Sequence, residues 1–252
     1  MKIVFNGAIQ NIQDTPCDSL GWLNGSGVFE TLRTEKAQVL AFAPHMQRAK
    51  ISAQILGFNL PHNMQVQAGV DELLAQEAHE IGLLRISFDV NGDWAAVHLP
   101  YRPPSAWAKI RTHPDLLALS GRIIKSYPYS HRLAILEEAR FLGFDEAIVV
   151  NTEGNISEGA VSNIIVFIDG LWRTPPLSDG VLPGIMRELV IQRCAVNENS
   201  IPASRIGEIT SAILLSSLRI AQSVESIDGR ELTASLSFNA QIHAAARQLW
   251  VG

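Results

Sequence analysis

Hydrophobic and polar positions follow two different spacings along the first hundred residues. Stretches of alternating character predict strands, among them a hairpin over 28–42 that turns at 34–36. Apolar residues three or four positions apart predict helices, one of them over 44–57 with Pro44 in its first turn and Gly57 at its end. The other elements expected here are strands at 2–7, 83–90 and 94–100 and a helix over 63–82.

The second half of the chain has the same mixture of elements. The expected helices lie at 130–143, 182–196 and 237–250, and the expected strands at 146–150, 162–168, 171–175, 212–217 and 223–229. A looser stretch, 103–121, contains three prolines. Because strands and helices mix without a regular βαβ alternation, we expect an α+β fold. We place a boundary in the looser stretch, which gives a small N-terminal domain, 1–114, and a larger C-terminal domain, 115–252.

Composition narrows the class of protein. The chain has 252 residues, of which 47% are hydrophobic and 18% charged, as in a globular protein with a sizeable core. The net charge of −5 offers no basic surface for nucleic acid, and the seven histidines lack metal-ligand spacing. Two cysteines, no membrane-length apolar run and an N-terminus without a signal-peptide core indicate a cytoplasmic protein.

Lys125 lies in an apolar and aromatic segment, GRIIKSYPYS at 121–130. Desolvation disfavours an ammonium ion, so these surroundings would lower the pKa of the lysine and favour the neutral amine that forms Schiff bases. The commoner alternative is a lysine that extends along its stem to reach water.

Three other segments have features that suit a phosphate group. A Gly/Pro loop leads into the helix expected at 182–196, where the backbone N–H groups of Gly184, Ile185 and Met186 would face an anion. Ser217 ends an apolar strand, and Arg48 carries a guanidinium fork on a helix. Each feature has an ordinary alternative, namely a simple helix start, a turn cap or a solvated arginine.

An acidic residue, Glu158, lies where the turn formers 151–155 give way to the apolar run 164–168. The ordinary explanation is a solvated hairpin carboxylate, because short motifs often match by chance.

Taken in order, these segments resemble the fold-type IV pyridoxal-phosphate enzymes, which include branched-chain aminotransferases, D-amino-acid aminotransferases and aminodeoxychorismate lyases. The similar stretches cover nearly the whole chain: NGSGVFETLR at 24–33, HMQRAKISAQILG at 45–57, KSYPYSHRLAILEEARFLGFDEAIVV at 125–150, ISEGAVSNIIVF at 156–167, TPPLSDGVLPGIMRELV at 174–190 and SSLRIAQSVESIDG at 216–229. The resemblance implies a two-domain fold with pyridoxal 5'-phosphate between the domains, and a homodimer.

The resemblance also assigns roles around the cofactor ring. It implies that Lys125 is the catalytic lysine that binds the cofactor covalently, and that Tyr129 lies near the phenolic oxygen. Glu158 corresponds to the glutamate that hydrogen-bonds the pyridine nitrogen. A carboxylate there keeps the ring protonated, so that the ring draws electrons from the substrate Cα.

The phosphate contacts follow from the same resemblance. Arg48 corresponds to the phosphate-binding arginine, Ile185 and Met186 to the pair whose backbone amides hold the phosphate, and Ser217 to a hydroxyl on its other side. The chain departs from the family pattern at Ser26, where an aspartate is usual, and at Met186, where a threonine is common. Asn91 replaces an arginine that D-amino-acid enzymes are expected to use for the substrate carboxylate.

Two enzyme functions and one binding function fit this family. The short chain and the SSLRIAQSV segment favour an aminodeoxychorismate lyase, which converts 4-amino-4-deoxychorismate to 4-aminobenzoate and pyruvate. The alternative is an aminotransferase for branched-chain or D-amino acids, and the loss of the arginine at 91 argues mildly against the D-specific class. A homologue that only binds the cofactor is disfavoured by the complete set of Lys125, Glu158 and Arg48.

Overall fold

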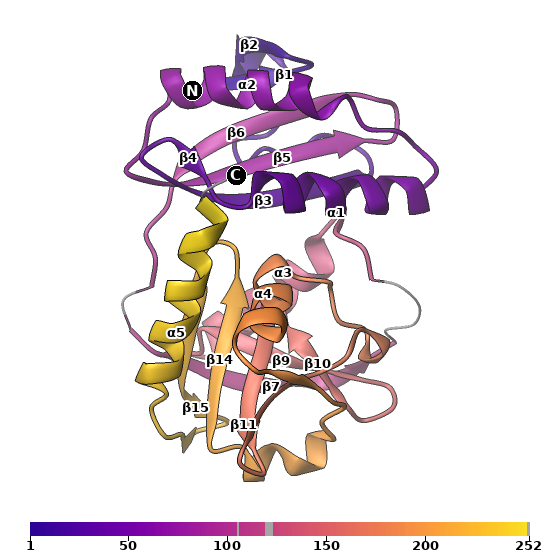
Figure 1. Ribbon diagram of the computed structural model, residues 1–252. Helices are drawn as coiled ribbons and strands as arrows, with labels where there is room; N and C mark the ends of the chain where they lie inside the picture. Colours follow the sequence, from indigo (N-terminus) through magenta and orange to yellow (C-terminus); the bar gives the residue numbers. More distant parts are fainter. Residues whose placement is uncertain (105, 119–122, 251–252) are drawn as a thin grey trace. The chain divides into compact units, whose positions relative to one another are not determined.

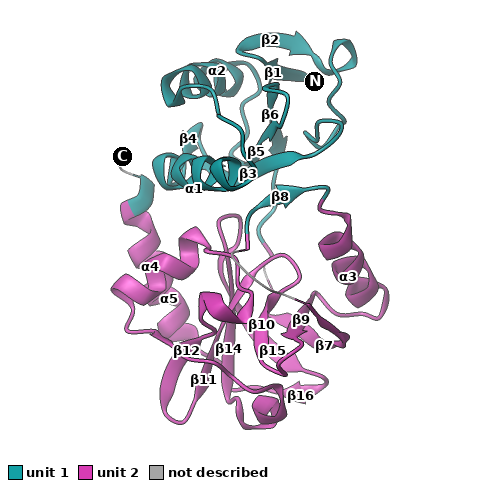
Figure 2. Ribbon diagram, turned by 90° about the vertical axis from the view of Figure 1, so that its right-hand side faces the viewer, with its two compact units in different colours: residues 1–103, 124–128, 249–252 teal, residues 104–123, 129–248 magenta. Residues whose placement is uncertain are grey.

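The contacts within the chain divide it into two compact units. The computed structural model describes residues 1–104, 106–118 and 123–250 (Figure 1). The first unit comprises 1–103, 124–128 and 249–252, and the second unit comprises 104–123 and 129–248 (Figure 2). The segment that carries Lys125 therefore packs with the N-terminal strands.

The first unit contains an antiparallel sheet. Its strands lie in the order β2-β1-β6-β5-β3-β4, and β8 pairs with β3. Their bounds are β1 Lys2–Phe5, β2 Ala8–Asn11, β3 Gly27–Glu35, β4 Gln38–Val39, β5 Ile81–Asp89, β6 Trp94–Pro100 and β8 Ser126–Tyr127. A short 3₁₀ helix, Ile12–Asp14, follows β2. The predicted hairpin over 28–42 is confirmed as β3 and β4.

Two helices cover one face of this sheet, α1 (Phe42–Ile55) and α2 (Asn63–Gln76). Even-numbered positions of β3, β5 and β6, such as Leu32, Ile86 and Ala96, join Met46 of α1 and Val70 of α2 in one core cluster. Because side chains alternate along a strand, the odd-numbered positions of β3 face the other side of the sheet. The side chains of Phe29 and Glu30 therefore lie on opposite faces of the sheet.

The second unit contains a nine-stranded mixed sheet in the order β10-β9-β7-β15-β14-β11-β12-β13, with β16 paired to β15. The strands are β7 Ala108–Leu117, β9 Glu146–Asn151, β10 Ile156–Gly159, β11 Asn163–Ile168, β12 Leu171–Thr174, β13 Asn197–Glu198, β14 Ser211–Ser216, β15 Ile220–Ile227 and β16 Arg230–Glu231. The helices are α3 Ser130–Phe141, α4 Ile185–Arg193 and α5 Leu236–Ala246, with 3₁₀ turns at Leu177–Asp179, Ala203–Glu208 and Arg247–Trp250.

The two faces of β9 explain how this unit is layered. Ala147 and Val149 pack against Leu136 and Ala139 of α3. Ile148, on the opposite face, joins the main apolar cluster of the unit with strands β11, β14 and β15. The predicted α+β class is confirmed, with helices lying against two sheets.

The largest difference from the sequence prediction is β7, a ten-residue strand inside the stretch expected to be loose. Pro114 is accommodated because the pairing of β7 with β9 changes register between Thr112 and Leu116. The boundary predicted at residue 114 thus falls inside a strand of the second unit's sheet. Two helices are also shorter than expected: the one expected over 63–82 ends at Gln76, and the one expected over 182–196 spans Ile185–Arg193.

Within the part of the chain that the structure describes, no helix combines the length and apolar character needed to span a membrane.

Candidate active site

Lys125 is fixed beside β3 by the short strand that follows it. Its carbonyl oxygen accepts a hydrogen bond from the Phe29 backbone N–H at 3.0 Å, and the next two residues pair with Val28 and Gly27. The Lys125 Nζ lies 4.5 Å from the centre of the Phe29 ring. The predicted apolar surroundings of this half-buried lysine therefore include an aromatic face.

The Phe29 ring packs in an aromatic cluster that we call the aromatic face, made of Trp22, Phe29 and Tyr127; Phe29 and Tyr127 are buried and Trp22 is half-buried. The Trp22 ring centre lies 4.6 Å from that of Phe29 and 5.9 Å from that of Tyr127. Arg85 closes one end, with its Cζ 4.2 Å from the Trp22 ring centre. Burial lowers the pKa of Arg85 to about 10, which still leaves it a cation at neutral pH.

Arg48 is a residue of α1, and its side chain meets the buried carboxylate of Glu30 on β3. Its Nε donates to Glu30 Oε1 at 2.9 Å and its Nη2 to Oε2 at 2.5 Å, a two-pronged contact. His45, one turn earlier in α1, lies with Nδ1 2.6 Å from the same Oε2. The sequence prediction named Arg48 but missed Glu30 and His45, the groups that set the orientation of its side chain.

Opposing effects set the charges in this cluster. Burial would raise the pKa of Glu30, but the Arg48 guanidinium and His45 together bring it down to about 2. Burial lowers the pKa of His45, and the cations of Arg48 and Lys125 lower it further. The cluster thus contains an ionised carboxylate, a neutral imidazole that donates through Nδ1, and an arginine. We call Lys125, the aromatic face and this cluster the first half-site.

Glu158, at the end of β10, is buried and not a solvated turn residue. Its Oε2 accepts from the Asn163 side-chain amide at 2.9 Å and from the Leu182 backbone N–H at 3.1 Å. Its Oε1 accepts from Arg132 Nη2, on α3, at 3.0 Å. Three donors from three elements therefore fix the carboxylate.

The loop before α4 is tied to the same point. Asn163 Nδ2 also donates to the Leu182 carbonyl oxygen at 3.0 Å. A Cβ added to Gly184 would lie 1.8 Å from Asn163 Oδ1, so only glycine allows this close approach. The helix begins at Ile185. Gly184, the residue before it, has no side chain to cap the N–H groups of the first turn, so these groups suit the binding of an anion. Pro183 precedes the helix and does not occupy its first position.

The remaining predicted residues of this unit lie on neighbouring elements. Asn163 pairs in register with Leu215, so Ser217, just beyond the end of β14, is near the start of β11. Tyr129 directly precedes α3, and its hydroxyl lies 3.5 Å from the Ala160 carbonyl oxygen. A second buried carboxylate, Glu146, accepts from Arg219 Nη1 at 3.1 Å and from the Ser162 hydroxyl at 3.0 Å.

The predicted residues thus fall into two sets. Lys125 and Arg48 belong to the first half-site; Tyr129, Glu158, Ile185, Met186 and Ser217 belong to the second unit, where with Arg132 and Asn163 they make what we call the second half-site. Sequence reasoning missed Trp22, Arg132 and Asn163. Asn163 follows an expected turn and begins a strand expected to be buried. A buried polar side chain needs hydrogen-bond partners, and this requirement could have identified Asn163 from the sequence.

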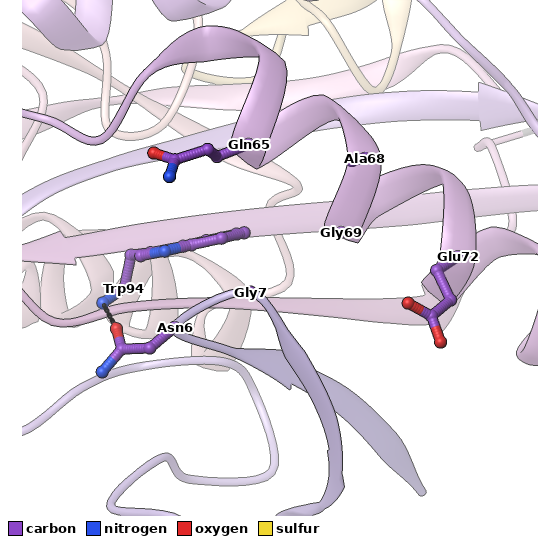
Figure 3. A pocket seen from close by; sticks show the side chains of 7 residues that line it. All are labelled: Asn6, Gly7, Gln65, Ala68, Gly69, Glu72 and Trp94. Atoms are coloured by element: carbon purple, nitrogen blue, oxygen red, sulfur yellow. Dashed lines mark hydrogen bonds between the residues drawn. The ribbon is translucent and has the colours of Figure 1, made fainter.

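A hollow of about 390 Å³ lies elsewhere in the first unit, over α2, β6 and the turn after β1 (Figure 3). Polar side chains that line it already make hydrogen bonds within the unit. The Asn6 side chain bonds Asp93 and the Trp94 N–H, and Gln65 caps the start of α2. The hollow includes none of the predicted site residues.

Comparisons with known proteins agree with this geometry. Residues 27–227 match the family model "Amino-transferase class IV". A Methanocaldococcus jannaschii protein, provisionally named a branched-chain-amino-acid aminotransferase, is 24% identical over 213 residues, 76% of this chain and 74% of its own length.

Solved structures share the fold. The branched-chain aminotransferase of Thermoproteus uzoniensis, solved with norvaline, is 25% identical with a TM-score of 0.84, covering 99% of this chain and 95% of its own. A Legionella pneumophila protein, provisionally assigned as a 4-amino-4-deoxychorismate lyase, is 21% identical with a TM-score of 0.80, covering 91% of both chains.

The Glu30 cluster generates a prediction about stability. Since the pKa of Glu30 falls from 4.5 to about 2 on folding, its contribution is fully present above pH 4.5 and is lost as the pH falls toward 2. Glu30→Gln should lower the free energy of unfolding at pH 7 by about 3 kcal/mol and flatten its pH dependence in that window. Denaturant unfolding between pH 2 and 7 would measure both effects.

Glu35→Gln provides the control on the same strand. Glu35 pairs with Arg33 but is 41% exposed, so its loss should cost less than about 1 kcal/mol. Equal stability of the two variants across the pH range would show that the Glu30 cluster does not stabilise the first unit.

Proposed function

Because the chain belongs to the class IV aminotransferase family, we propose that its two half-sites act together on one molecule of pyridoxal phosphate. The family is pyridoxal-phosphate-dependent, and a solved neighbour, an aminotransferase from Mycobacterium tuberculosis, is in its PLP-bound form. The proposal assigns Lys125 and Arg48 of the first unit and Glu158, Tyr129, Ile185, Met186 and Ser217 of the second to this cofactor.

The residues present fit such a group. A flat heteroaromatic ring with a basic nitrogen suits Glu158, a buried carboxylate already fixed by three donors. A phosphate suits the first-turn N–H groups of α4 and a guanidinium such as Arg48, which Glu30 orients. Met186 offers its backbone N–H but no hydroxyl, so Ser217 supplies the hydroxyl contact.

Each of these residues has a separate role in the proposed reaction. Pyridoxal phosphate, when bound, supplies an electron sink for the carbon that carries the substrate amino group. Lys125 Nζ would hold the cofactor and move the proton of that substrate carbon. Glu158 would hold a proton at the ring nitrogen, and Arg48 with the start of α4 would bind the phosphate. The aromatic face beside Lys125 excludes water from the amine.

We propose an aminodeoxychorismate lyase as the specific activity. The observation that carries this proposal is the aromatic face of Trp22, Phe29 and Tyr127 next to Lys125, with Arg85 at its end. A cyclohexadiene ring would lie against aromatic side chains, and a carboxylate would meet the guanidinium. Lys125 would take the proton from the amino-bearing ring carbon, and the bond between the neighbouring ring carbon and the enolpyruvyl oxygen would break. The enolpyruvate that leaves would take up a proton to become pyruvate, and aromatisation to 4-aminobenzoate would drive the reaction.

An aminotransferase for branched-chain or D-amino acids is the second candidate. It is supported by the relative from Methanocaldococcus jannaschii and by the Thermoproteus uzoniensis structure, both named for branched-chain substrates. The same Lys125 would then return the proton to the cofactor carbon, and the aromatic face would hold an aliphatic side chain.

Family resemblance also supports a homodimer, and light scattering of the purified protein at micromolar concentration should give twice the mass of one chain. An active monomer would contradict it.

Lys125 should carry the cofactor. The protein should purify yellow, and borohydride should bleach the visible band and leave a tagged peptide that contains Lys125. Lys125→Ala should lose the tag, whereas Lys50→Ala, an exposed lysine of the same unit, should keep it. A tag on any other lysine would remove Lys125 from the reaction.

A direct assay separates the two activities. The protein should release 4-aminobenzoate and pyruvate from 4-amino-4-deoxychorismate, and Arg85→Met should raise KM for that substrate more than it lowers kcat. Incubation with leucine or D-alanine and 2-oxoglutarate provides the second arm. Amino transfer with no 4-aminobenzoate formed would replace the lyase by the aminotransferase.

A further inference from the structure

Arg132, on α3, forms an ion pair with Glu158. Its Nη2 lies 3.0 Å from Glu158 Oε1, and the two side chains are only 12% and 8% exposed. The Nη1 atom of Arg132 is buried without a hydrogen-bond partner in the described part of the chain. The charge of this guanidinium is therefore balanced mainly by a single carboxylate.

Glu158 also accepts hydrogen bonds from two neutral donors. On Oε2 the donors are the Asn163 amide from β11 and the Leu182 N–H from the loop before α4. Glu146 of β9, the strand paired with β10, has its own arginine, Arg219. Arg132 is thus a charged group placed to alter how strongly the Glu158 carboxylate attracts a proton on a neighbouring atom.

We propose that Arg132 is a positioning residue that tunes the proposed cofactor site by sharing the charge of Glu158. This inference rests on the proposed function, which places the pyridine nitrogen at Glu158. A carboxylate that already neutralises a guanidinium attracts a second cation less strongly than a carboxylate alone. Arg132 therefore makes the ring nitrogen less basic and moderates the electron sink that Glu158 creates.

The opposite role would be purely structural. Arg132 could simply hold Glu158 in place, in which case its loss would weaken the contact of Glu158 with the ring. The two roles predict opposite signs. With charge sharing, removal of Arg132 makes the ring nitrogen more basic; with a scaffold role, removal makes it less basic, as removal of Glu158 would.

The experiment measures the ring-nitrogen chemical shift in protein loaded with ¹⁵N-labelled pyridoxal phosphate, titrated with pH. Arg132→Met should raise the apparent protonation constant of the nitrogen about tenfold or more, and Glu158→Gln should lower it. Arg132→Lys keeps the charge and should stay near wild type. Arg140→Met removes a charge from an exposed position of the same helix and should change nothing.

The outcomes separate the inference from the proposed function. No uptake of the cofactor, or no effect of Glu158→Gln, would overturn the proposed function itself. If Glu158→Gln shifts the resonance and Arg132→Met shifts it the same way or not at all, charge sharing is wrong. A higher KM in Arg132→Met with an unchanged resonance would instead place Arg132 against the substrate and would also overturn it.

Discussion

Buried carboxylates, each held by an arginine, are the constraint on which both half-sites depend. Glu30 pairs with Arg48, Glu158 with Arg132, and Glu146 with Arg219. An isolated buried charge costs several kcal/mol, and loss of one partner leaves the other uncompensated. Neither member of a pair can therefore move independently, so these side chains are rigid before any ligand binds.

The alternation of β3 connects two different tasks in the first unit. Phe29 faces one side, where it supports the amine of Lys125 and carries the aromatic face. Glu30 faces the other side, where it orients Arg48 under α1. One strand thus sets the orientation of both the Lys125 amine and the Arg48 guanidinium, the two groups of this unit that we propose hold the cofactor. A slip of one residue in the pairing of β3 with β5 would exchange these two faces.

Sequence reasoning recovered what local patterns encode. The α+β class, the β3–β4 hairpin and most helices follow from apolar spacing, and Lys125, Arg48 and Glu158 lie in stretches similar to a known family. The strand β7 was missed because its proline and polar positions look like a loop, and only its partners β9 and β15 make it a strand. Glu30 and Arg132 were missed because their partners lie 18 and 26 residues away, a distance that no local pattern spans.

The two units hold different groups of the proposed site. In the second unit the carboxylate Glu158 receives donors from α3, β11 and the loop before α4, so its position depends on that unit alone. In the first unit the aromatic face and Arg85 form a surface whose shape depends on the strands β3, β5 and β8 and the loop before β3. Under the proposed function, substitutions at the aromatic face would change which substrate is accepted while the groups around Glu158 stay in place. Such a separation would let one fold support both elimination and amino transfer, because both reactions begin with loss of the proton on the amino-bearing carbon and differ in which bond breaks next.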